Sequence, residues 1–129
     1  SEQLKCLHLD ELAALLGVKF GSPCAEEVMR AYQTRLEFAD WDADTRWDLA
    51  RCYAAQGDYA QAVQAYEGVL QTQPEFHDAR KELIFCLAAQ GQWDQAETEA
   101  RHMKRFKNAR EEARLALQCL QALRYRSQE

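Results

Sequence analysis

Residues 44–62 read DTRWDLARCYAAQGDYAQA, and residues 78–96 read DARKELIFCLAAQGQWDQA. The two stretches lie 34 positions apart and agree at ten of their positions. Internal similarity at this period is typical of stacked helical hairpins, in which each hairpin buries its apolar face against the next. Such an array offers a surface that holds another chain, so the repeat indicates protein binding in preference to catalysis.

The composition favours one all-helical domain. With 129 residues, of which 47% are hydrophobic and 29% charged, the chain can bury a core and is not disordered as a whole. Good helix formers dominate, whereas Ile84 is the only isoleucine. No apolar run approaches the roughly 20 residues needed to cross a bilayer, so we expect no membrane contact from this chain.

Five cysteines are scattered along the chain without a CxxC pair: Cys6, Cys24, Cys52, Cys86 and Cys119. An odd number without close spacing argues against a disulfide framework and against a zinc site. We therefore expect unpaired cysteines, no metal ion, no cofactor and a cytoplasmic location.

Helix start and stop signals predict about seven helices. The first is 9–16, closed by Gly17, and the second begins with Ser22 as N-cap and Pro23 as first residue and ends at about residue 39. Asp42 or Asp44 is expected to cap the third helix, Asp58 the fourth, and Gly57 and Gly91 to end the first helix of each repeated hairpin. Pro74 stops the fourth helix, and the last helix runs from about 109 to 124.

The repeats resemble the tetratricopeptide repeat family. In residues 43–74 the family pattern is carried by Arg46, Leu49, Ala50, Tyr53, Ala62, Tyr66 and Pro74. Residues 77–108 match less closely, through Arg80, Leu83, Ile84, Leu87, Ala96 and Ala100, and Asn108 stands where the family has its proline. The resemblance implies an all-α, short right-handed superhelical stack with N-terminal helices in 1–41, repeats at 43–74 and 77–108, and a capping helix in 109–129. Arginine stands at the family's usual tryptophan in both repeats, and Ile84 replaces a small residue.

In this family the first helices of the hairpins line a concave groove in which a peptide or helix of a partner protein binds. The resemblance therefore implies a groove formed by Asp44, Trp47, Asp48, Arg51, Asp78, Lys81, Glu82 and Phe85. We expect Trp47 and Phe85 to anchor the partner, with Arg51 and Lys81 pairing with a carboxylate. Alternatively, the two aromatic side chains pack against neighbouring helices or the N-terminal segment. The function expected from this groove is that of an adaptor or chaperone.

Charge is unevenly distributed along the chain. Residues 1–50 carry ten acids and five bases, whereas residues 101–129 carry three acids and eight bases. The bases of RHMKRFKNAR form a candidate patch for an anionic partner: Arg101, Lys104, Arg105, Lys107 and Arg110. Because the net charge is −5, we favour an acidic protein over nucleic acid here, or self-association between the acidic first half of one copy and the basic end of another. No histidine or cysteine arrangement indicates a catalytic site.

Overall fold

The computed structural model describes residues 6–128, which form seven α-helices and one short 3-10 helix without any strand. The helices are α1 (Leu9–Leu16), α2 (Glu26–Phe38), α3 (Ala43–Ala55), α4 (Tyr59–Thr72), α5 (His77–Ala89), α6 (Trp93–Met103), η1 (Lys107–Ala109) and α7 (Arg110–Ser127). The predicted all-α fold with about seven helices is confirmed.

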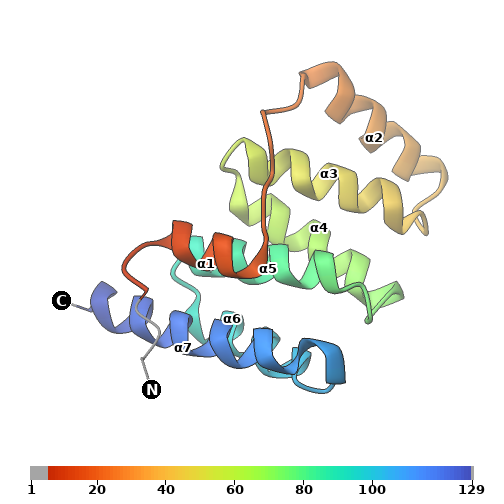
Figure 1. Cartoon of the computed structure of the whole chain (residues 1–129). Helices are drawn as coiled ribbons and strands as arrows, with labels where there is room; N and C mark the ends of the chain where they lie inside the picture. The colour runs from red at the N-terminus through yellow and green to blue at the C-terminus, as the bar shows by residue number, and fades with distance from the viewer. Residues whose placement is uncertain (1–5, 129) are drawn as a thin grey trace.

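Helices α2 to α7 pack in chain order, each against the next, as a stack of antiparallel helices (Figure 1). Two hairpins, α3–α4 and α5–α6, form its centre and correspond to the two repeated stretches. Gly57 and Gly91 turn these hairpins with φ angles of 81° and 74°, values that favour glycine. The Asp58 carboxylate then caps α4 by accepting a hydrogen bond from the Gln61 backbone N–H.

The arginine in the family's tryptophan position makes the same contact in both repeats. Arg46 Nη2 donates to the Asp40 carbonyl at 2.6 Å, and Arg80 Nη2 donates to the Pro74 carbonyl at 2.9 Å. Arg80 is buried and also pairs with the Glu99 carboxylate. Each arginine therefore fixes the turn that precedes its own hairpin.

Helix α1 does not pair with α2 as the first helix of a further hairpin would. It packs against α5 and α7, and Leu12 and Leu16 are buried in that contact (Figure 1). The α1–α2 linker, residues 17–25, then runs back to α2. The chain's own N-terminal helix thus covers part of the face formed by α3, α5 and α7, the first helices of the stack.

Four of the five cysteines form disulfides, so the prediction of unpaired cysteines is wrong for them. Cys6 is bonded to Cys119 with Cα atoms 5.1 Å apart, and Cys24 to Cys52 with Cα atoms 5.5 Å apart. The pairs are separated by 113 and 28 residues and meet only through the tertiary fold, which spacing along the chain does not reveal. Cys86 is free and fully buried.

The predicted start of the second helix is also wrong. Helix α2 begins at Glu26, and Ser22 and Pro23 belong to the linker. The disulfide of Cys24 ties the linker to α3, and Gln56 Nε2 donates to the Cys24 carbonyl at 3.4 Å. These tertiary bonds hold the backbone away from the helical conformation that Pro23 would otherwise favour.

Candidate functional site

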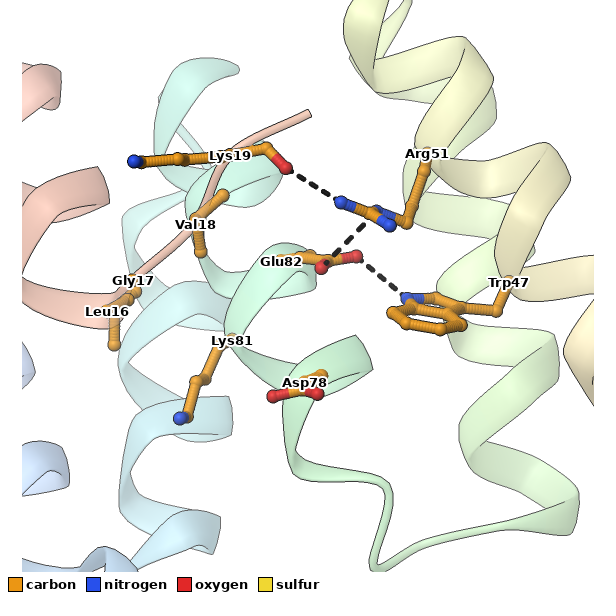
Figure 2. A pocket seen from close by; sticks show the side chains of 9 residues that line it. All are labelled: Leu16, Gly17, Val18, Lys19, Trp47, Arg51, Asp78, Lys81 and Glu82. Atoms are coloured by element: carbon orange, nitrogen blue, oxygen red, sulfur yellow. Dashed lines mark hydrogen bonds and ion pairs between the residues drawn. The ribbon is translucent and has the colours of Figure 1, made fainter. Parts of the chain in front are cut away.

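The face formed by the first helices remains open beside the α1–α2 linker, where α3 and α5 bound a cavity of about 310 Å3. We call it the groove cavity. It is lined by Leu16, Gly17, Val18, Lys19, Trp47, Arg51, Asp78, Lys81 and Glu82 (Figure 2). Five of the eight residues predicted for the groove therefore surround one cavity. Asp44, Asp48 and Phe85 do not line it.

Glu82 lies between α3 and α5 and connects the side chains of the groove cavity. Its Oε1 accepts hydrogen bonds from Trp47 Nε1 and from the Tyr66 hydroxyl, both at 2.8 Å. Its Oε2 lies 3.6 Å from Arg51 Nε (Figure 2). Glu82 itself is buried, so a carboxylate in the interior receives two hydrogen bonds and a cation, as such a group requires.

The electrostatics of Glu82 are set by opposing effects. Burial raises the pKa of the Glu82 carboxyl, whereas the hydrogen bonds from Tyr66 and Trp47 and the charge of Arg51 lower it. Burial and the neighbouring Glu82 charge also raise the pKa of the Cys86 thiol to about 12. Glu82 is therefore part of the floor of the site, and it fixes Trp47 and Arg51 rather than presenting a free carboxylate.

Arg51 joins the linker to the floor of the groove cavity. Its guanidinium carbon lies 5.1 Å from the centre of the Trp47 ring, and Nη2 donates to the Lys19 carbonyl at 2.8 Å (Figure 2). The Trp47 ring also packs against Phe76, with ring centres 4.8 Å apart. Both predicted groove residues are thus held in place before any ligand binds.

Phe85 is not an exposed anchor, and that prediction is wrong. Its side chain is only 9% exposed and packs against Phe20 of the linker and Tyr59 of α4, with ring centres 5.7 Å and 6.0 Å apart. The alternative in which this aromatic packs against the N-terminal segment is the one observed. Of the other two residues, Asp44 is exposed and Asp48 is half-buried, and burial raises the pKa of Asp48.

Sequence reasoning missed the contribution of residues 16–19 to this cavity. Leu16 ends α1 and residues 17–19 follow it, so their position depends on α1 packing against α5 and α7. The sequence did show apolar residues in α1 followed by Val18 and Phe20, and such residues are expected to be buried against another part of the chain. Nothing in that run specified which surface it would be.

The five predicted basic-patch residues are all exposed and surround the connection between α6 and α7. Arg101 pairs with Glu97 at 3.3 Å, and Arg110 Nε donates to the Lys104 carbonyl at 3.2 Å. Arg105 also borders a second cavity of about 690 Å3, whose other lining residues are Thr72, Gln73, Pro74, Glu75, Phe76, His102 and Phe106. Burial, followed by the charges of Arg80 and Arg105, lowers the pKa of His102.

Residues 6–128 hold no arrangement typical of a metal site or of a membrane span. Within that range no group of three or more His, Cys, Asp and Glu side chains is placed to hold a metal ion. None of the helices described there is both long enough and apolar enough to cross a membrane.

The family model for the tetratricopeptide repeat matches residues 54–119, from the end of α3 into α7. Searches of curated proteins and of solved structures each returned no significant match. Tetratricopeptide repeats generally mediate protein–protein interactions and are typically not enzymes. Since the match covers half of the chain and the helices stack as the repeat pattern predicts, the chain belongs to the tetratricopeptide repeat family.

Proposed function

We propose that this protein is an interaction module, an adaptor or chaperone that binds a peptide or helix of another protein in the groove cavity. Residues 1–129 would act as one domain, with the repeats at 43–74 and 77–108 providing the binding face; residues 1–5 and 129 lie outside those that the structure describes. No catalytic role is proposed.

The observation that carries this proposal is the groove cavity itself. Trp47 and Arg51 of α3 and Lys81 of α5 border it, so successive first helices contribute to one site. Trp47 and Arg51 are fixed by Glu82, and a fixed side chain loses less conformational entropy when a partner binds. Aromatic residues and arginine are also the residues that most often dominate the energy of protein interfaces.

Helix α1 supports a short amphipathic helix as one kind of ligand. It is an eight-residue helix on the same face of the stack, with Leu12 and Leu16 buried against it. Two first helices of the stack, α5 and α7, therefore already bind one short helix, α1. A partner segment would bind beside α1, where the face is still open.

The charges of the cavity favour a ligand that carries a carboxylate. Lys19 is exposed, and Lys81 Nζ pairs with Glu112 at 3.0 Å across a partly exposed contact. Such a pair contributes only about 0–1 kcal/mol, so Lys81 can exchange Glu112 for a carboxylate of the ligand at little cost. Asp78 on the same rim disfavours a ligand with many acidic residues.

The two disulfides indicate the kind of compartment in which the protein is found. Two disulfides are typical of proteins from oxidising compartments. They argue against the cytoplasmic location expected from the cysteine count.

The proposal is tested by selecting ligands from a random peptide library displayed on phage and measuring the affinity of the enriched peptides by calorimetry. The variant K19E/K81E reverses the charge of both lysines that line the cavity, and R30E/R126E is the control with the same charge change at two exposed positions elsewhere. We expect the first variant to bind at least about tenfold more weakly and the control to match the wild type. Failure to enrich any peptide, or equal weakening by both variants, would contradict the proposal.

A further inference from the structure

Two turns of opposite charge lie on the same edge of the stack, where α2 passes to α3 and α6 passes to α7 (Figure 1). The acidic turn, residues 37–44, reads EFADWDAD and contains four acids and no base. The basic turn, residues 101–110, reads RHMKRFKNAR and contains five bases and no acid. The connection between α4 and α5 lies between them on the same edge.

The acidic turn presents two large apolar side chains to solvent. Phe38 is 85% exposed and Trp41 is 70% exposed. Large apolar side chains gathered on a surface usually mark an interaction site. The backbone that carries them is fixed on both sides. Asp42 accepts from Arg35 Nε at 3.1 Å and from the Thr45 hydroxyl at 2.8 Å, and the Asp40 carbonyl accepts from Arg46. Trp41 is therefore presented by a rigid turn.

The basic turn borders a site that fits an aromatic side chain. The second cavity, which we call the edge cavity, measures about 690 Å3, well above the roughly 150 Å3 that holds a benzene ring in a protein interior. Phe76 and Phe106 form aromatic walls, and Phe106 is packed against His77 with ring centres 4.6 Å apart. Pro74 adds a third apolar surface.

The charges around these two features are complementary. Lys104, Arg105 and Lys107 form no ion pair with any of residues 6–128. On the acidic turn, Asp42 pairs with Arg35. Glu37, Asp40 and Asp44 form no ion pair with any residue in the range 6–128. Glu75 is the one acidic residue among those that line the edge cavity, and the basic turn beside the cavity carries five bases.

We propose that two copies of this chain form a two-fold symmetric dimer in which Trp41 of each copy enters the edge cavity of the other. The acidic turn of one copy then faces the basic turn of its partner, and two-fold symmetry makes this contact twice and leaves no unused end. A second copy is the occupant because both complementary surfaces are present on the same chain. The edge cavity and the groove cavity have no lining residue in common, so the dimer goes beyond the proposed function.

The decisive experiment exchanges charges between the two turns. The variant E37K/D40K/D44K changes the acidic turn from a charge of −4 to +2, so it has two basic turns, and K104E/R105E/K107E changes the basic turn from +5 to −1, so it has two acidic turns. Each variant alone should dimerise at least about tenfold more weakly than the wild type, measured by sedimentation over a concentration series. An equimolar mixture should recover the dimer, because every contact between unlike copies again joins opposite charges.

Two further measurements complete the test. Wild-type dimers should weaken between about 0.1 M and about 1 M salt, over which the screening length falls from about 10 Å to about 3 Å. Trp41→Ala should weaken the dimer at least about tenfold, whereas Tyr125→Ala, which removes an aromatic side chain of the same 70% exposure on α7, should not.

A wild-type chain that stays monomeric at about 0.1 M salt would overturn the proposal, and so would a mixture that fails to recover the dimer. A monomer whose basic turn binds a polyanion or an acidic peptide would assign that turn to another partner and equally overturn it. The variant K19E/K81E should dimerise normally, so failure of the groove proposal and failure of the dimer are distinguishable.

Discussion

Removing the Cys6–Cys119 disulfide should destabilise this protein more than removing Cys24–Cys52. The bonds close chain segments of 113 and 28 residues, and a cross-link restricts the unfolded chain more when the loop is longer. The chain-entropy relation assigns about 4.8 kcal/mol to the first bond and about 3.6 kcal/mol to the second. The difference of about 1.2 kcal/mol is the more dependable quantity, because effects common to both bonds cancel.

The assay compares C6A/C119A with C24A/C52A by urea unfolding without reductant. Alanine is chosen because Cys6, Cys52 and Cys119 are buried and serine would leave a hydroxyl in the interior. A thiol count in denaturant provides the control. Oxidised wild type should show one reactive thiol, that of Cys86, and the reduced chain should show all five.

Two results would refute this reasoning. If oxidised wild type shows five thiols, the cysteines are not paired. If C24A/C52A loses more stability than C6A/C119A, loop length does not govern the effect of these bonds.

Three further predictions concern stability, each measured by urea unfolding. Burial holds the pKa of Glu82 above its ordinary value of 4.5, so the folded state binds the proton more tightly than the unfolded state does. The contribution of Glu82 to the free energy of unfolding should therefore fall as the pH rises from 4.5 through the folded-state pKa. Glu82→Gln should lack this fall, and parallel pH profiles of the two proteins would contradict the assignment. Phe85→Ala should cost about 3 kcal/mol or more because the side chain is buried, whereas Phe38→Ala, at an 85% exposed position, should stay within about 0.5 kcal/mol; equal losses would argue against this difference in burial. Gly57→Ala should cost about 1 kcal/mol through its φ of 81° alone, since no atom lies within 4 Å of the added Cβ, and an unchanged midpoint would show that the turn relaxes freely.

Local signals predicted the hairpins well because each helix boundary depends on a few neighbouring residues. Gly57 and Asp58 end one helix and cap the next through contacts within a single turn of chain. The bounds of α1 were predicted correctly for the same reason, since Gly17 follows Leu16 with a left-handed φ of 69°. The repeat then implied how neighbouring hairpins stack.

The features that the sequence did not predict all depend on contacts between distant segments. Phe85 has the spacing of a groove residue, but it became buried because Phe20 of the linker packs over it. The partner of Cys6 is 113 residues away, and the position of α1 on α5 and α7 has no local signature. Five of the eight predicted groove residues therefore line the cavity, whereas Phe85 is buried where the N-terminal segment packs over it.

Helix α1 is attached to the stack at both of its ends, by the Cys6–Cys119 bond just before it and by the linker just after it. It therefore competes for α5 and α7 as a tethered ligand, whose effective concentration for short tethers is on the order of millimolar. A free helix of equal intrinsic affinity would displace it only above that concentration. A partner should thus bind beside α1 and not in its place. Breaking the disulfide would remove one tether and lower the partner concentration needed to displace α1.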